Sequence, residues 1–158
     1  MTILVDTREK DSKHITDWFD KKKIPYKSKA LSNGDYSFFI PANPALNIDR
    51  DLYFDQEIAI ERKGGLDELS GNFTQHRTRF EEEMATYPGK MYLLIENASY
   101  DNIIKGNYQT KFSAKAFLGS LHTFNHRYNL HITFMPDRDS SGCFIYGTFL
   151  YYLKHVLH

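Results

Sequence analysis

The sequence has a single cysteine and no long apolar run. Cys143 has no partner for an intramolecular disulfide or a cysteine-bound zinc cluster, so a reducing compartment suits the chain. No stretch approaches the roughly 18 apolar residues of a membrane span, and the charged start MTILVDTREKD is not typical of a secretion signal. We therefore expect no membrane partner and no secretion. The expected location is the cytoplasm of a bacterial or phage-infected cell, or the nucleus in a eukaryote.

An excess of charge of either sign is also missing. The 20 Lys and Arg residues balance the 20 Asp and Glu residues. The net charge therefore gives no hint of a nucleic-acid partner, although a DNA enzyme can set a basic groove against an acidic metal site. Apolar residues make up 41% of the 158-residue chain and aromatic residues 15%. This composition argues against disorder and supplies the core of one domain.

The most informative stretch is IAIERKGGLD, residues 58–67. Apolar and small residues lead directly into Glu61, Arg62 and Lys63, which predicts charged groups at the end of a buried strand. Burying such groups side by side is costly unless they are paired or bind something. Because side chains alternate along a strand, Glu61 and Lys63 share one face and Arg62 lies on the other. A carboxylate beside an ammonium could hold Mg²⁺ and steady a phosphate during phosphodiester hydrolysis.

One carboxylate makes a poor magnesium site, so a second acid is expected from elsewhere in the chain. The natural candidate is Asp35, which follows the turn-like Asn33-Gly34 and precedes an apolar strand expected at residues 36–40. Glu96 also follows an apolar strand, but we leave it out of the predicted ligands.

The same residues match a known signature. Its members stand in the chain in this order: Gly34-Asp35, Glu61-Arg62-Lys63 and Asp67. They resemble the G-D-(gap)-E-R-K-x-x-x-D signature of the XPF family of structure-specific DNA endonucleases, a branch of the PD-(D/E)XK nuclease superfamily. An E-x-K triplet alone would be weak evidence, whereas all six residues in order are strong evidence.

The resemblance implies a fold and an activity. The implied fold is α/β, with a restriction-endonuclease-like central mixed β-sheet flanked by helices. The implied activity is divalent-metal-dependent hydrolysis of phosphodiester bonds in DNA, in branched structures such as flaps, forks or junctions. Asp35 and Glu61 would coordinate Mg²⁺ or Mn²⁺, with a backbone carbonyl near Arg62 and waters, and Lys63 would orient the attacking water or stabilise developing charge.

The start of the chain adds further candidates. Its V-D-x-R-E pattern resembles the first motif of the family and contributes Asp6, Arg8 and Glu9. With Asp67, the two acids of this motif are expected as further ligands or as partners that hold the basic residues of the site. Arg8 is expected to contact the substrate phosphate. From the residues alone, a loop of solvated charges is an equally good interpretation of this motif.

A helical pattern over residues 67–87 supplies a further arginine. Arg77 is the best match to the arginine that the family places after its signature, and Arg79 is the alternative. A guanidinium suits bidentate contact with phosphate, so Arg77 is expected to bind substrate. The alternative is an exposed ion pair with Glu81 or Glu82.

Hydrophobic patterning predicts the remaining elements. Strands are expected at residues 3–5, 26–31, 36–40, 52–62, 91–95 and 130–135. Helices are expected at residues 12–23, 67–87 with a break at 71–75, 113–128 and 141–156. Residues 41–51 form a connection, which as a protruding hairpin could reach substrate or be tolerated surface, and we favour tolerated surface. His122 and His126 lie one helical turn apart, and we favour a solvated polar face over a zinc site.

The helix expected at residues 141–156 is apolar over more than half its circumference. Such a helix either lies deep in a core or buries a second face against another chain. XPF-type nuclease domains dimerise through helices near the end of the domain, so the resemblance implies a homodimer contact here. Purely internal packing is the alternative.

The resemblance extends over nearly the whole chain, so one nuclease domain is expected over residues 1–158. Nothing in it resembles the tandem helix-hairpin-helix module that many relatives append, which leaves the preferred DNA structure open. Two other functions remain: a catalytically inactive DNA-binding scaffold of the same fold, and an RNA- or DNA-binding module with structural acids. The presence of Asp35, Glu61 and Lys63 favours the active enzyme.

Overall fold

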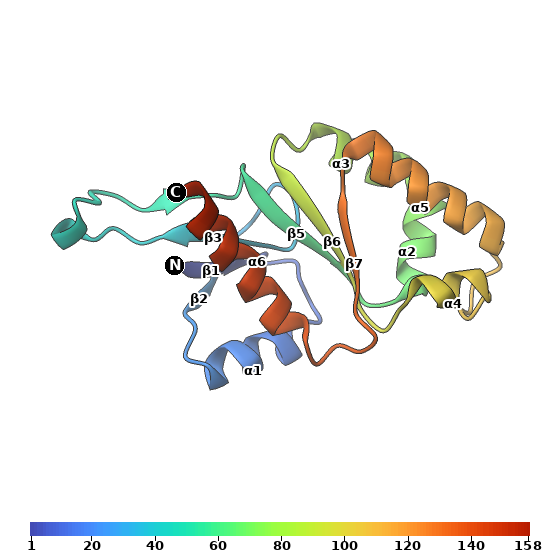
Figure 1. The fold of residues 1–158 in the computed structure, drawn as a ribbon, viewed down its shortest axis with the longest axis horizontal. Coiled ribbons are helices and arrows are strands. Elements are labelled where there is room, and N and C mark those ends of the chain that lie inside the picture. Colours follow the sequence, from blue (N-terminus) through green and yellow to red (C-terminus); the bar gives the residue numbers. More distant parts are fainter. The chain divides into compact units, whose positions relative to one another are not determined.

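Seven β-strands and six α-helices follow one another along the chain (Figure 1), and the computed structural model describes all 158 residues. The strands are β1 (Thr2–Val5), β2 (Tyr26–Ser28), β3 (Tyr36–Ile40), β4 (Leu52–Tyr53), β5 (Ile58–Lys63), β6 (Lys90–Ile95) and β7 (His131–Phe134). The helices are α1 (Lys13–Lys21), α2 (Leu66–Phe73), α3 (Arg77–Thr86), α4 (Tyr100–Ile104), α5 (Ala114–Tyr128) and α6 (Ser141–Val156), with a short 3-10 helix η1 (Pro44–Leu46). None of these helices is both long and apolar enough to cross a membrane.

The strands form one mixed sheet in the order β2-β1-β3-β5-β6-β7, with β4 paired to β3. β1 runs parallel to β2 and antiparallel to β3, and β6 runs parallel to β7. The predicted α/β fold with a mixed sheet flanked by helices is therefore confirmed. The chain divides into two compact units, residues 1–60 with 139–158 and residues 61–138, so that the boundary falls within β5.

In the first unit, α6 packs on β3 and on α1. The ring of Phe38 on β3 lies 5.3 Å from that of Phe149 on α6. Where the two helices meet, a Cβ on Gly142 would come within 3.0 Å of Trp18 atoms. A side chain at position 142 would therefore require these Trp18 atoms to move by a few tenths of an ångström.

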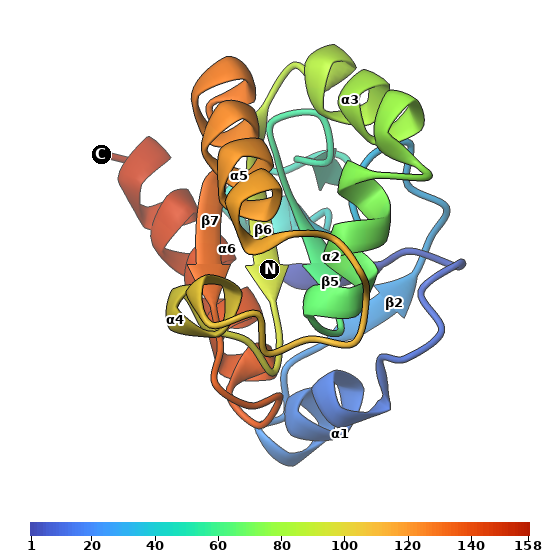
Figure 2. The ribbon, with the colours of Figure 1, turned by 90° about the vertical axis from the view of Figure 1, so that its right-hand side faces the viewer.

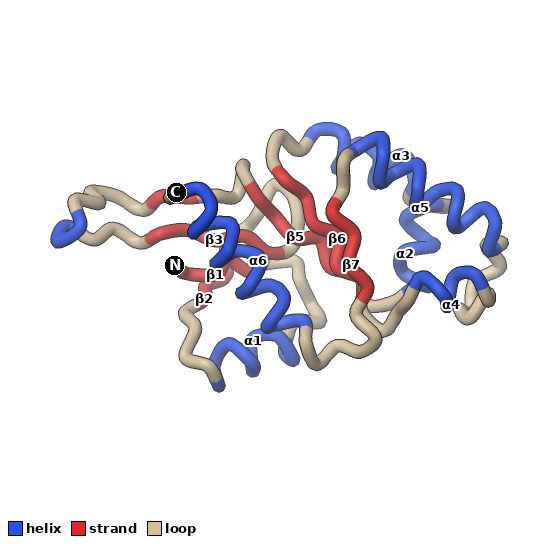
Figure 3. The backbone as a smooth tube through the Cα atoms, viewed as in Figure 1, coloured by secondary structure: helices blue, strands red, loops and turns tan.

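An arm of residues 41–51 connects β3 to β4, and η1 lies near its tip (Figure 3). Its two sides are tied by an isolated bridge between Asn43 and Ile48 and by a hydrogen bond from the N–H of Ala42 to Asp51 Oδ1 (2.8 Å). Leu46 at the tip is largely exposed. The protruding hairpin is thus confirmed as a structure, and a contact with substrate stays a hypothesis.

In the second unit, α2, α3 and α5 lie on one face of β6 and β7 (Figure 1 and Figure 2). Aromatic rings join these helices, because Phe124 on α5 lies 4.8 Å from Phe73 on α2 and 5.5 Å from Phe80 on α3. Edge-to-face and offset rings at such distances add to the stabilisation from apolar burial. This layer fixes where α2 and α3 stand in the second unit.

The strands predicted over residues 52–62 and 26–31 differ most from the structure. The strand predicted over residues 52–62 is two strands, β4 and β5, because the N–H groups of Glu57 and Ile58 both donate to the Phe54 carbonyl in an intervening turn (2.9 and 3.0 Å). β2 ends at Ser28 rather than at residue 31. The N–H of Leu31 donates to the Asp6 side chain and its carbonyl accepts from Arg8, so neither group is available for pairing with a strand. The predicted helix over residues 67–87 is two helices, and the break lies at residues 74–76, slightly later than expected.

Candidate active site

Glu61 and Lys63 form an ion pair at the end of β5. Lys63 Nζ lies 3.0 Å from Glu61 Oε2, and the two side chains are only 8% and 13% exposed. The same ammonium lies 5.1 Å from the centre of the Phe80 ring. Strand alternation predicts this shared face, and the ring and the carboxylate together hold the lysine in place. A mostly buried ammonium of this kind is preorganised to interact with a further negative group.

Arg62, between them, points to the other face and pairs with Glu96. Its Nη1 lies 2.6 Å from Glu96 Oε1, and both side chains are almost fully buried. Glu96 comes directly after β6, and its N–H donates to the Lys63 carbonyl (2.8 Å). Glu96 was not among the predicted metal ligands. In the structure its carboxylate neutralises the charge of Arg62. A carboxylate directly after a continuous apolar strand was the signal for this role.

A pocket of about 230 Å³ opens beside the Glu61–Lys63 pair. Its other walls come from α2, α3 and the segment between them, with these residues: Asn72, His76, Arg79, Phe80 and Glu83. The Oδ1 atom of Asn72 is buried and has no hydrogen-bond partner. The pocket thus combines two carboxylates, an ammonium, a guanidinium and an imidazole, which are the kinds of group that bind and turn over phosphate esters. Neither Asn72 nor His76 belongs to the residues predicted from the sequence.

Asp35 is fixed in the first unit by a close backbone approach. Gly34 has φ +76°, and a Cβ there would lie 2.8 Å from Ala59 Cβ and 3.2 Å from the Ile60 carbonyl oxygen. The N–H of Asp35 donates to that same carbonyl of Ile60 (2.8 Å), one residue before Glu61. The glycine of the Gly-Asp pair is therefore required both for its conformation and for its lack of a side chain.

The first motif anchors the loop that leads to Asp35. Asp6 is buried, and its carboxylate accepts the N–H of Leu31 (2.9 Å) and the Nε of Arg8 (3.0 Å). The N–H of Asp6 donates to the Asp35 carbonyl (2.8 Å), and the N–H of Glu9 to the Asp6 carbonyl (3.0 Å). Arg8 keeps 68% of its side chain exposed. Asp6 thus has a clear structural task, while the roles predicted for it, for Arg8 and for Glu9 at the substrate stay predictions.

Asp67 and Arg77 each make a hydrogen bond to a distant segment of the second unit. Asp67 is exposed in the first turn of α2 and accepts the N–H of Gln109 (2.8 Å). Arg77 Nε lies 3.1 Å from Glu81, and its Nη1 donates to Ser120 Oγ on α5 (2.9 Å). The ion pair foreseen as the alternative for Arg77 is therefore present. Substrate binding by Arg77 stays a prediction, and of the two arginines considered it is Arg79 that lines the pocket.

His122 and His126 are both exposed on α5. His122 Nε2 lies 2.7 Å from the hydroxyl of Tyr100, which agrees with the favoured polar face. No group of three or more His, Cys, Asp or Glu side chains stands together in a way that could hold a metal ion.

The fold is that of the XPF nucleases, as comparison with solved structures shows. XPF from Aeropyrum pernix in complex with DNA matches with a TM-score of 0.70 and 15% identity, over 97% of this chain and 65% of that chain. A second structure of XPF from Aeropyrum pernix matches with a TM-score of 0.63 and 15% identity, over 92% of this chain and 58% of that one. This chain therefore spans less than two thirds of the length of either.

The family follows from the sequence itself. The chain belongs to the ERCC4 domain family, whose model matches residues 5–148. The resemblance to the XPF family drawn from the six signature residues is thereby confirmed. No curated protein matches the chain.

Proposed function

We propose that this chain is a divalent-metal-dependent endonuclease that hydrolyses phosphodiester bonds in branched DNA. The observation that carries the proposal is the Glu61–Lys63 pair, mostly buried at the end of β5 and open to a pocket of about 230 Å³. Membership of the ERCC4 domain family supports nuclease chemistry. A match to an XPF structure in complex with DNA supports DNA as the substrate.

The proposed metal ligands are Asp35 and Glu61, with a backbone carbonyl near Arg62 and waters. Mg²⁺ is usually held by one or two carboxylates and keeps several waters, so it needs no cluster of three acidic side chains. Hard carboxylate oxygens on a rigid strand and on a tightly constrained turn fit Mg²⁺ or Mn²⁺. When bound, such an ion lowers the pKa of a coordinated water and offsets charge on the phosphate.

The basic residues of the chain would handle the phosphate. Lys63 is held by Glu61 and by the Phe80 ring, and it would donate to the phosphate oxygen on which negative charge develops. Arg8 and Arg77 are proposed to contact the scissile phosphate or its neighbour. Arg62 acts indirectly in this proposal. Its pairing with Glu96 on the opposite face holds β5 in place, and β5 carries Glu61 and Lys63.

Asp6, Glu9 and Asp67 are proposed as secondary acids. The carboxylates of Asp6 and Asp67 hold the loops that follow β2 and precede α5. In the proposed reaction they keep the site rigid or supply further ligands.

A cleavage assay tests the proposal directly. The parent, Asp35→Ala and Lys63→Ala are incubated with a labelled fork or flap and Mg²⁺, and the products are separated by size. We expect each substitution to lower the cleavage rate by about 100-fold or more, as for the loss of a preorganised charge. Chelation by EDTA should abolish cleavage, and added Mg²⁺ or Mn²⁺ should restore it.

Matched substitutions of exposed residues provide the control. Asp49→Ala and Lys10→Ala remove the same groups from exposed positions and should leave cleavage unchanged. Cleavage that survives both Asp35→Ala and Lys63→Ala would rule out the mechanism. Binding of the fork by the parent without cleavage would instead identify an inactive scaffold, and equal cutting of a linear duplex would rule out the preference for branched DNA.

We also propose that the chain forms a homodimer through α6. The helix buries Ile145 and Phe149 in its own unit, yet Tyr151, Val156 and Leu157 at its end are 67%, 47% and 72% exposed. Large apolar side chains gathered at one exposed helix end are typical of a surface that contacts another chain.

A further inference from the structure

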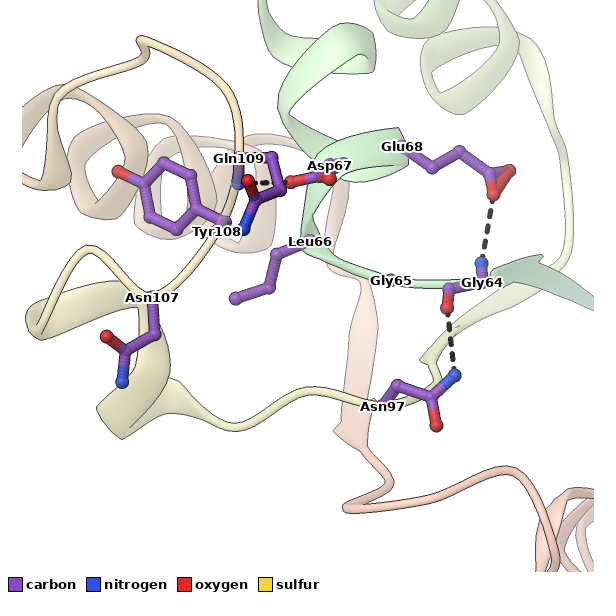
Figure 4. Close-up of a pocket in the computed structure, with 9 residues that line it drawn as sticks. All are labelled: Gly64, Gly65, Leu66, Asp67, Glu68, Asn97, Asn107, Tyr108 and Gln109. Atoms are coloured by element: carbon purple, nitrogen blue, oxygen red, sulfur yellow. Dashed lines mark hydrogen bonds between the residues drawn. The ribbon is translucent and has the colours of Figure 1, made fainter.

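The second unit contains a second pocket, of about 410 Å³, whose lining begins at Gly64, the residue that follows Lys63 (Figure 4). Three segments build it: residues 64–68 at the start of α2, Asn97 after β6, and residues 107–109 before α5. Leu66 lies in the middle of the view, between Asn107 and the Gly64-Gly65 loop. None of the residues proposed for metal binding or for the attack on the phosphate lines this pocket, apart from the secondary acid Asp67.

Hydrogen bonds tie the three segments together. Asn97 Nδ2 donates to the Gly64 carbonyl (3.2 Å), and Asp67 accepts the N–H of Gln109 (2.8 Å). One helical turn further along α2, Ser70 donates to Thr110 Oγ1 (2.9 Å). The walls are therefore held in place before any ligand arrives, which lowers the entropic cost of binding.

The charge of the pocket disfavours a phosphate. It has no lysine, arginine or histidine in its lining, and it has two acids, Asp67 and Glu68. The start of α2 would otherwise attract an anion, but Glu68 Oε2 already accepts the N–H of Gly64 (2.9 Å). The lining therefore suits a ligand that presents a neutral hydrogen-bonding group, rather than an anion, to the pocket.

Side-chain amides give the pocket its recognition chemistry. Asn97, Asn107 and Gln109 each offer a donor and an acceptor, and Leu66 adds an apolar surface. Tyr108 also lines the pocket, and its ring is held by a hydrogen bond from its hydroxyl to the Phe112 carbonyl (2.5 Å) and by packing 5.2 Å from the Phe117 ring. Amides of this kind read the hydrogen-bonding edge of a nucleobase, as Asn and Gln do with adenine.

We propose that this pocket binds the base of an unpaired nucleotide beside the phosphate that is cut. The inference rests on the proposed function and adds a physical reason for its substrate preference. A base can enter a protein pocket only when it leaves the stack, and this costs least for a nucleotide that is already unpaired. Flaps and forks carry such nucleotides at the branch point, whereas a continuous duplex does not.

The test combines a change in the protein with a change in the DNA. Asn107→Ala/Gln109→Ala removes two amides and leaves the three ties between segments intact, since those use the Asn97 side chain, the Gln109 backbone and Ser70. Affinity for a fluorescent fork is measured by anisotropy, with Ca²⁺ in place of Mg²⁺, and cleavage is measured with Mg²⁺. A second fork has abasic sites in place of the unpaired bases next to the branch.

We expect the double variant to bind and cut the natural fork at least about fivefold less well, as for the loss of a good base contact. It should treat the abasic fork as the parent does, because the abasic fork has no base for the amides to bind. Gln56→Ala, which removes an exposed amide that does not line the pocket, is the control and should change neither value.

The possible failures are distinguishable. An equal loss on both forks, or no loss on the natural fork, would overturn the base-binding role. Absence of cleavage by the parent would count against the proposed endonuclease. The anisotropy measurement would still decide the base-binding proposal in that case, because it needs no cleavage.

Discussion

Arg62 is a guanidinium almost fully removed from water, and its pairing with Glu96 makes that burial tolerable. Removal of one partner leaves the other charge buried without its close counter-charge, whereas replacement of both by apolar residues removes both buried charges. We expect Glu96→Ala to lower the free energy of unfolding by about 3–5 kcal/mol. Chemical denaturation measures the change.

The double variant Arg62→Met/Glu96→Leu serves as the control for this prediction. It should recover most of the stability lost in Glu96→Ala, since no unpaired charge remains. A double variant as unstable as the single one would mean that the two residues act through other partners rather than through each other.

Asn72 presents the opposite case, a polar atom that the fold leaves unsatisfied. Its Oδ1 is buried without a hydrogen-bond partner in a wall of the Glu61–Lys63 pocket. Such an acceptor costs about 1–3 kcal/mol, so Asn72→Leu should leave the unfolding free energy unchanged or raise it. Thermal and chemical unfolding of the variant measure this. A loss of more than about 1 kcal/mol would show that the amide has a partner in solution.

For single residues, the sequence predicts which face of a strand a side chain lies on better than it predicts which residues that side chain contacts. Alternation along β5 placed Glu61 with Lys63 and Arg62 apart from them, and the structure confirms both assignments. Phe80 under the lysine and Glu96 beside the arginine were not predicted. These contacts depend on how α3 and β6 fold back on β5, which local patterning does not specify.

Among the helices, two serines occupy the same position with different results. Ser113 precedes α5 and its hydroxyl accepts the N–H of Ala116 (3.2 Å), whereas Ser12 precedes α1 and makes no such bond. We expect Ser113→Ala to cost about 1 kcal/mol, the usual value for a lost helix cap. Ser12→Ala should change stability by less than about 0.5 kcal/mol. Urea denaturation of the two variants tests the pair, and equal losses would contradict it.

Helix boundaries were predicted well from the sequence, and strand boundaries less well. α6 runs over the expected residues 141–156, because an apolar stripe with a turn-rich approach marks a helix strongly. The prediction of one strand over residues 52–62 was wrong, because the turn after Phe54 has no glycine or proline to mark it in the sequence. β2 was cut short by the Asp6 carboxylate, a contact that joins residues far apart in sequence.

For the molecule as a whole, the main prediction is that two copies associate through α6. Burial of Tyr151 and Leu157 against a second chain would remove from water the two most exposed apolar side chains of the helix. A glutamate in such an interface would bury an unpaired charge. We therefore expect a dimer at micromolar concentration, and we expect Tyr151→Glu/Leu157→Glu to weaken dimerisation by at least about tenfold, as for an interface hot spot.

Light scattering coupled to size exclusion measures the mass of each variant over a concentration series. Leu46→Glu is the matched control, because Leu46 is 68% exposed at the tip of the arm and does not belong to α6. The control should keep the mass of the parent, while the α6 variant should approach that of one chain. A parent that is strictly monomeric at micromolar concentration would show that the end of α6 serves some other contact. A monomeric parent would not affect the proposal for the charged pocket at the end of β5, because all residues that line this pocket belong to the second unit.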